Sequence, residues 1–205
     1  PFIKTSGELK TKPTQHSVRE LRAIGIQPDI VLCRTDRFLD KNIKAKISLF
    51  TNIRLEAVIT AKDVDCIYEV PLGFAKEGLD IIILKQLLLA PRRRNLAGWR
   101  KMVERMRHPL DEVNIALVGK YAGLHDSYIS LTQALNHAGT HHELKVRIFW
   151  VEAEDLEEAK ARDILKDADG ILVPGGFGVR GIEGKILSIN FARKEKVPFL
   201  GICLG

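Results

Sequence analysis

The chain has 205 residues, of which 45% are hydrophobic and 28% charged, a balance typical of globular domains that excludes a disordered protein. Its net charge of +6 is unevenly spread, because residues 1–111 carry 21 basic and 13 acidic side chains whereas residues 112–205 carry 11 and 13. No apolar run is long enough to span a bilayer and no secretory signal opens the chain. We therefore expect a cytoplasmic protein without membrane contact, and the missing initiator Met suggests a piece of a longer one.

The N-terminal half is predicted to alternate helices and strands. Ser17 is a possible N-cap of the first helix and Gly25 stands in the usual stop position, while Asp40 can cap the second helix. The predicted helices cover residues 17–25, 41–50 and 81–89, and the predicted strands cover 29–34 and 56–60, the second followed by a loop at 61–65.

An Arg-rich segment, residues 90–111, is predicted to connect two domains and to contain one amphipathic helix. After it, strands and helices alternate regularly, which favours a parallel sheet. We predict an α/β protein of two domains, each a mostly parallel sheet with helices on both faces, at residues 1–89 and 112–205. The strands of the second domain are predicted at 113–119, 144–151, 170–176 and 198–203, and its helices at 127–139, 155–165 and 184–195.

The basic charge of the first part predicts contact with polyanions. No aromatic interleaving, zinc-finger spacing or Gly-rich basic tail supports nucleic acid, so we expect nucleotide phosphates instead. A solvated basic surface is the alternative. The three cysteines, Cys33, Cys66 and Cys203, are odd in number and widely spaced, which favours a reducing compartment over a zinc site or a disulfide framework.

Cys203 lies in the sequence G-I-C-L-G at the end of the last predicted strand. This is the spacing of a nucleophile elbow, in which flanking glycines relieve the crowding of a strained turn. A buried structural cysteine between two glycines is the alternative. A helix after Cys203 would favour the thiolate.

The segment VPGGFG, residues 173–178, ends the preceding predicted strand, so adjacent parallel strands would bring it beside Cys203. Gly175 and Gly176 can expose backbone N–H groups, and the amide of Leu204 can supply a second donor, as an oxyanion hole requires. Together the two segments favour Cys203 as a nucleophile over a structural cysteine.

These motifs carry a resemblance to known families. Residues 172–185 (LVPGGFGVRGIEGK) and 197–205 (VPFLGICLG) resemble the triad-type glutamine amidotransferase domain. The chain is similar to the CTP synthase family along essentially its whole length. The similarity includes, in this order, residues 4–29, AKISLF, KDVDCIYEVP and LVGKY. The resemblance implies an enzyme that uses ATP to activate the uracil 4-oxygen of UTP as a phosphate ester and replaces it with ammonia cut from glutamine.

The resemblance places the contacts to UTP, and to CTP as feedback inhibitor, on two basic segments. The alternation of Lys10 and Lys12 in an extended stretch before Pro13 would put both ammonium groups on one side, and Lys46 would join them from a helix. A solvated basic loop is the alternative. The implied UTP and CTP residues are Lys10, Thr11, Lys12, Pro13, Thr14, Gln15 and Lys46, and the implied ATP residues are Lys62, Asp63 and Val64, which otherwise fit an ordinary polar turn.

In the amidotransferase part, the resemblance makes Cys203 the nucleophile and gives glutamine and oxyanion contacts to Gly176, Leu204 and Gly205. A lid linked to activation by GTP would include Phe177, Arg180, Gly181 and Glu183. For Arg180 and Glu183 the alternative is an ion pair at a helix start, which contributes little at a surface.

Other parts of the implied site fall outside the chain. In the family, the ATP loop and the magnesium carboxylates precede residue 1, and the triad His and Glu follow residue 205, so no metal ligand is expected here. All six histidines precede Cys203; His16 adjoins the UTP segment but also fits an ordinary helix start. We expect the 205 residues alone to be inactive, and the family assembles as homotetramers. The alternative function is an inert nucleotide-binding or regulatory module that keeps an amidotransferase-like domain.

Overall fold

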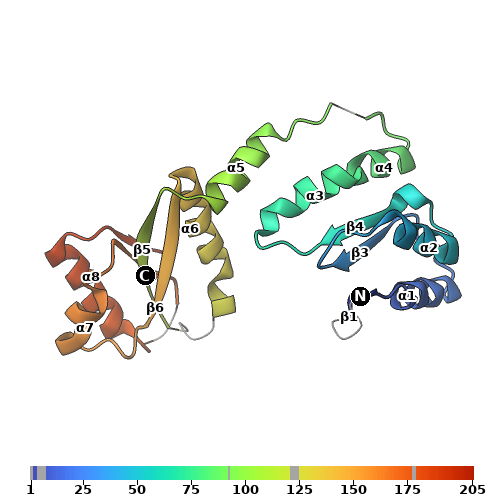
Figure 1. Ribbon diagram of the computed structural model, residues 1–205. Helices are drawn as coiled ribbons and strands as arrows, with labels where there is room; N and C mark the ends of the chain where they lie inside the picture. The colour runs from blue at the N-terminus through green and yellow to red at the C-terminus, as the bar shows by residue number, and fades with distance from the viewer. Residues whose placement is uncertain (1, 4–7, 92, 121–124, 177–178) are drawn as a thin grey trace. The chain divides into compact units, whose positions relative to one another are not determined.

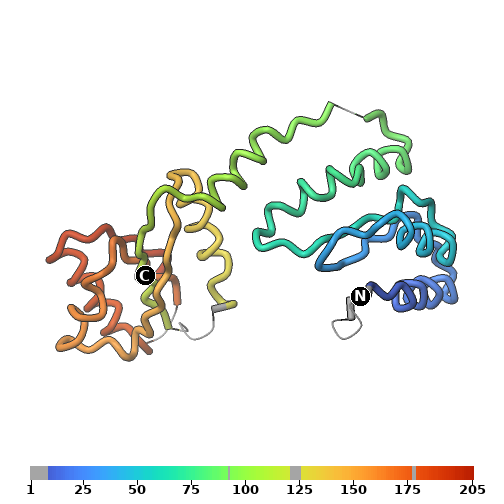
Figure 2. The backbone as a smooth tube through the Cα atoms, in the orientation of Figure 1, coloured from blue at the N-terminus to red at the C-terminus, as the bar shows by residue number. Residues whose placement is uncertain are grey.

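The computed structural model describes residues 2–3, 8–91, 93–120, 125–176 and 179–205. The chain divides into two compact units, Pro1–Val103 and Glu104–Gly205. The division falls inside helix α5 (Ala97–Arg107), which lies within the predicted connector and can be followed along the backbone in Figure 2. Each unit is described by itself below.

The first unit is built on a parallel strand pair, β3 (Val31–Thr35) and β4 (Val58–Lys62), in register from Val31 opposite Val58 to Thr35 opposite Lys62. A short antiparallel pair, β1 (Phe2–Ile3) and β2 (Glu8–Leu9), precedes it. The other elements are α1 (Lys12–Ala23), α2 (Lys41–Thr51), α3 (Val70–Glu77) and α4 (Leu79–Gln86), with 3-10 turns at Leu55–Ala57 and Ile67–Glu69 (Figure 1).

The N-terminal end of α1 corrects one prediction. The helix begins at Lys12, not at Ser17, and Ser17 lies inside it with its hydroxyl donating to the Pro13 carbonyl at 3.0 Å. The fixed φ of proline suits a first helical turn, where the missing N–H costs nothing. Lys12 is therefore helical rather than part of an extended stretch, and the side-by-side alternation expected for Lys10 and Lys12 is wrong.

The other predicted helix signals of this unit are confirmed. Gly25 follows α1 with φ +89°, a conformation that glycine adopts without strain. The Asp40 side chain caps α2 by accepting a hydrogen bond from the Ile43 amide at 2.8 Å. Helix α3 was not predicted, because Pro71 and Gly73 make its sequence look like a loop.

A charged contact joins three elements of the first unit. Glu77 of α3, whose side chain is 14% exposed, accepts hydrogen bonds from the Lys44 ammonium of α2 and from the Thr60 amide of β4, the latter at 3.0 Å. Partial burial on its own would raise the pKa of Glu77. The hydrogen bonds from Lys44 and Thr60 outweigh that effect, and the pKa lies below its ordinary value.

We expect this contact to make the stability of the first unit depend on acid. Since the folded-state pKa of Glu77 is below the unfolded one, its stabilisation is complete above the ordinary carboxyl pKa and is lost as the pH falls through the folded value. Glu77→Gln should lower the free energy of unfolding at neutral pH by about 1 to 3 kcal/mol and flatten its acid dependence. Chemical denaturation at several pH values measures both, with the exposed Glu56→Gln as control. If the free energy of unfolding has the same pH dependence in Glu77→Gln and in the unmutated protein, the prediction is contradicted.

The second unit is a four-stranded parallel sheet in the order β6-β5-β7-β8. Its strands are β5 (Asp111–Gly119), β6 (Leu144–Glu152), β7 (Gly170–Val173) and β8 (Phe199–Gly201), and its helices are α6 (Ile129–His141), α7 (Glu158–Leu165) and α8 (Ile182–Glu195), with a 3-10 turn at His125–Tyr128. The predicted α/β alternation is confirmed here (Figure 1).

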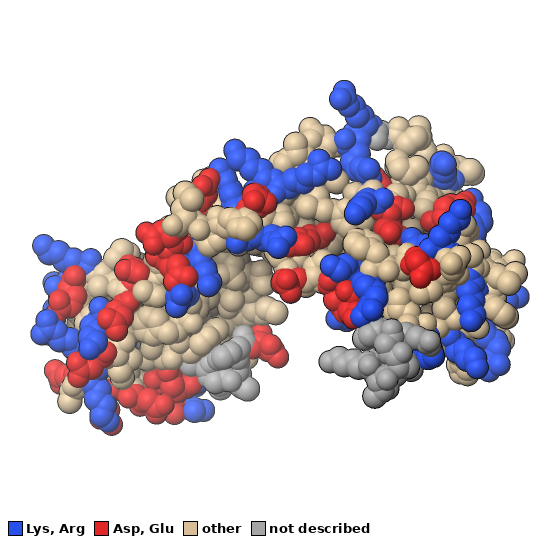
Figure 3. All heavy atoms as spheres, viewed as in Figure 1, with Lys and Arg blue, Asp and Glu red and all other residues tan. Residues whose placement is uncertain are grey.

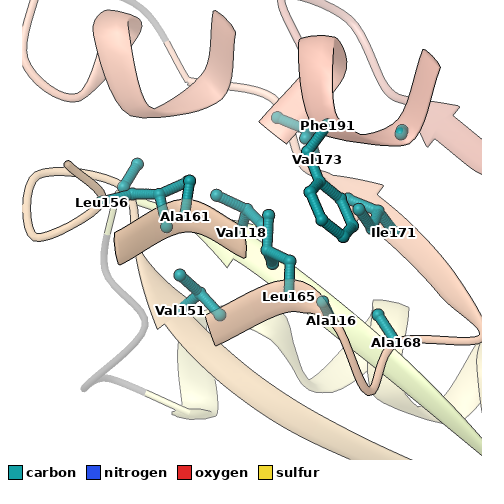
Figure 4. Close-up of a cluster of buried hydrophobic side chains, with 12 residues drawn as sticks. Ala116, Val118, Val151, Leu156, Ala161, Leu165, Ala168, Ile171, Val173 and Phe191 are labelled. Carbon is teal, nitrogen blue, oxygen red and sulfur yellow. The ribbon is translucent and has the colours of Figure 1, made fainter. Parts of the chain in front are cut away.

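Helices cover both faces of this sheet. On one face, α7 and α8 enclose a core cluster; in Figure 4, Leu165 lies near Ala116 and Val118, and the Phe191 ring lies beside Ile171. On the other face, residues of α6 pack with Leu117 of β5. Because α6 and α8 lie on opposite faces, the chain leaves the carboxyl ends of β5 and β7 in opposite directions. In sheets of this kind, ligands bind at the carboxyl ends of the two strands where the directions diverge.

Candidate active site

Cys203 lies two residues beyond the end of β8, on a turn. Its φ is +57°, a left-handed conformation that side chains rarely adopt, and its thiol is exposed and free. Backbone strain of this kind is held by its surroundings and occurs preferentially at functional sites. A left-handed turn with an exposed thiol is the geometry that the predicted elbow requires.

The two flanking glycines make this turn possible. A Cβ on Gly201 would lie 2.3 Å from the Gly205 carbonyl oxygen, and a Cβ on Gly205 would lie 2.0 Å from the Val173 carbonyl oxygen. No side chain fits at either distance. The turn is closed by hydrogen bonds from the Ile202 amide to Val173 and from the Gly205 amide to Ile202, both at 3.0 Å.

The glycine loop after β7 lies directly against the cysteine. The Cβ position on Gly175 is 3.1 Å from the Cys203 Cβ and 3.8 Å from its Sγ. Among the described residues, none accepts a hydrogen bond from the amides of Gly176 or Leu204. Free backbone donors near a thiol are the chemical requirement of an oxyanion hole.

The other two cysteines lie in different surroundings. Cys33 is buried in β3, and burial raises the pKa of its thiol. Cys66 is partly buried at the start of a 3-10 turn. Since the thiolate is the reactive form, geometry and exposure favour Cys203 as the nucleophile.

The predicted GTP lid lies at the start of α8. Gly181, with φ +77°, precedes the helix, and Glu183 is exposed in the first turn. The Arg180 guanidinium pairs with Glu154 in the loop after β6. Phe177 lies outside the described residues.

The predicted UTP segment borders a cavity of about 320 Å³ between the start of α1, strand β3 and helix α2. Thr11 is buried at the N-cap position and accepts a hydrogen bond from the Gln15 amide group at 3.1 Å. Leu9, Lys10, Thr11, Pro13, Thr14 and Ser17 line the cavity on this side, and residues of β3 with Leu39, Ile43 and Ile47 line the other.

Three other basic residues of this region lie on the helices. Lys12 and Lys46 are exposed on α1 and α2, which pack together, but neither lines the cavity. His16 is also exposed on α1 and faces Glu20 at 3.7 Å, so it has the position of an ordinary helix residue. On the face seen in Figure 3, basic side chains are interspersed with acidic ones.

The predicted ATP segment lies at the carboxyl ends of β3 and β4. The Asp63 amide donates to the Thr35 carbonyl at 2.7 Å, and its carboxylate accepts from Arg34 at 2.8 Å. Val64 follows in the loop. This is the edge of a parallel sheet at which nucleotides bind.

Two residues that the sequence did not single out adjoin this segment. The ammonium groups of Lys62 and Lys76 lie 5.8 Å and 5.0 Å from the centre of the Phe38 ring, which is 47% exposed. Cation–π contacts of this kind orient both lysines. No spacing could have revealed the group, because its members come from the loop after β3, from β4 and from α3.

Within the described ranges, no three His, Cys, Asp or Glu side chains gather as a metal site requires. None of the helices in that part of the chain has the length and apolar composition needed to cross a membrane.

Comparison with known proteins gives two family matches. The family model described as CTP synthase N-terminus matches residues 1–89, and the model for class-I glutamine amidotransferases matches residues 124–205. Together the two matches take in most of the chain.

Curated relatives match the whole chain. It is 57% identical to the CTP synthase of Koribacter versatilis and 52% identical to that of Methanocaldococcus jannaschii, covering 37% and 39% of those proteins. The chain thus spans less than half the length of these relatives. A solved structure, the glutaminase domain of Trypanosoma brucei CTPS with bound acivicin, is 40% identical with a TM-score of 0.43, over 45% of this chain and 37% of that one.

Proposed function

The chain belongs to the CTP synthase family, and on that premise we propose that it forms the middle of an enzyme that converts UTP to CTP with ATP and glutamine. The second unit would release ammonia from glutamine, and the first would bind UTP and ATP. The observation that carries the proposal is the Cys203 elbow, which faces Gly175 and adjoins the amides of Gly176 and Leu204, for which no acceptor is found among the described residues.

The glutaminase step follows from this geometry. The Cys203 thiolate would attack the side-chain amide carbon of glutamine, and the amides of Gly176 and Leu204 would donate to the oxygen that becomes negative. Ammonia leaves with a proton from a general acid, and water then releases glutamate from the thioester. By family resemblance, the acid and base come from a His and a Glu beyond residue 205.

The direct test is turnover by the complete protein. We expect CTP to form from UTP and ATP with either glutamine or ammonia as nitrogen donor. Binding of UTP and ATP without turnover from either donor would favour the inert regulatory module instead.

The cavity beside α1, which Lys10 lines, and the exposed Lys12 and Lys46 on the adjoining helices support a UTP and CTP site on Lys10 to Gln15 and Lys46. Lys12→Ala or Lys46→Ala should weaken UTP and CTP binding about 10- to 100-fold, because each removes a charge-assisted phosphate contact of about 1.5 to 3 kcal/mol. Calorimetry measures the affinity, and glutamine hydrolysis should stay largely intact. Exposed Lys41→Ala on α2 is the matched control. Equal UTP affinity in all variants would remove the assignment.

The other ligands belong to the same proposal. ATP would lie at Lys62, Asp63 and Val64, where the lysines provide positive charge for its phosphates. The magnesium that accompanies ATP would be held by carboxylates outside this chain, GTP would activate through the lid segment at Arg180 to Glu183, and the enzyme would assemble as a homotetramer. A cytoplasmic location fits because Cys203 must remain a free thiol.

A further inference from the structure

A buried lysine lies beneath the glycine loop of the glutaminase site. Lys185, in the first turns of α8, is only 7% exposed. Its ammonium donates a long hydrogen bond, 3.4 Å, to the Pro174 carbonyl, and it lies 3.8 Å from the Cβ position on Gly176. Within the described part of the chain, no carboxylate lies within ion-pair distance of it.

The buried ammonium of Lys185 needs an explanation. Lysine is rarely buried without a partner, because a charge removed from water loses far more solvation than one weak hydrogen bond returns. Replacing a buried charge by an apolar side chain of similar volume is often neutral or stabilising. The stability of the fold therefore gives no reason for an ammonium at residue 185. The glycine loop after β7, which adjoins the ammonium, gives one.

We propose that Lys185 is a positioning residue of the glutaminase site that holds the oxyanion loop through the Pro174 carbonyl. The carbonyl of Pro174 and the amide of Gly175 belong to one planar trans peptide and point in opposite directions. The hydrogen bond from Lys185 holds the Pro174 carbonyl towards α8 and so fixes the orientation of that peptide. The same contact fixes the start of the Gly175–Gly176 backbone, which lies against Cys203. The positive charge also favours negative charge developing at this loop, because Lys185 is itself buried and its charge is less screened by water.

The helix is built to bring Lys185 to this place. The neighbouring Gly184 lies so close to the loop after β6 that a Cβ would be 1.8 Å from the Ala153 carbonyl oxygen. This contact fixes the start of α8 against the end of the sheet. The ammonium therefore reaches Pro174 from a rigid element.

The test uses Lys185→Met in the complete protein, since Met has similar length but neither charge nor donor. We expect kcat for glutamine hydrolysis to fall about tenfold or more, with little change in KM, because oxyanion donors act mainly on the transition state. Ammonia-dependent CTP formation and the melting temperature should be unchanged or higher. Lys194→Met, on the exposed last turn of the same helix, is the matched control.

The outcomes separate this inference from the proposed function on which it rests. If the unmutated protein hydrolyses no glutamine, the proposed function fails. If it does, and Lys185→Met has the same kcat, the positioning role is wrong. A variant that melts clearly lower and also loses ammonia-dependent synthesis would show that Lys185 supports the fold, which equally overturns the role.

Discussion

Cys203→Ala in the complete protein should abolish CTP formation from glutamine and leave CTP formation from added ammonia. The reason is that the thiol supplies the nucleophile for the amide, whereas amination of UTP would occur in the other unit, at residues that do not include Cys203. We expect the glutamine-dependent rate to fall by more than about 10⁴-fold. Parallel assays with the two nitrogen donors measure this division.

The controls for Cys203→Ala are the other two cysteines. A glutamine-mimicking electrophile should label Cys203 well before Cys33 or Cys66, and mass spectrometry of the peptides locates the label. Cys66→Ala should hydrolyse glutamine normally. Loss of both donor activities in Cys203→Ala, with the fold intact, would show that the two reactions are not divided as proposed.

Sequence patterns predicted the elbow because its requirements are local. Gly201 and Gly205 flank Cys203 at the spacing the turn demands, and the end of an apolar strand places them at the edge of the sheet. The neighbouring glycine loop followed from the same logic, since both segments end parallel strands. The alternation of strands and helices was likewise sufficient to predict the parallel sheet of the second unit.

The remaining features depend on packing that no local pattern encodes. Helix α3 was missed because Pro71 and Gly73 are ordinarily helix breakers, although proline is tolerated in a first turn and the helix packs against β4. Lys185 gives no signal either, since a lysine in a helix is normally solvated. Phe38 and Lys76 are joined only by the tertiary fold.

Gly184→Ala should be the most destabilising small change in the second unit. Its Cβ would lie 1.8 Å from the Ala153 carbonyl oxygen and 2.7 Å from the Ala153 carbonyl carbon, and both are backbone atoms that cannot rotate away. Helix α8 or the loop after β6 must then move. We expect a loss of about 3 kcal/mol, seen as a melting temperature lower by about 15 °C for a unit of this size.

The matched control is the same substitution in open space. Gly98 is also helical, in α5, and nothing lies within 4 Å of its Cβ position, so Gly98→Ala should leave stability unchanged or raise it by up to about 1 kcal/mol. Because Lys185 follows Gly184 directly, displacement of α8 should also withdraw the ammonium from Pro174 and reduce glutamine hydrolysis more than ammonia-dependent synthesis. If Gly184→Ala has the melting temperature of the unmutated protein, the loop at Ala153 moves at little cost, and the rigid placement of α8 argued above is wrong.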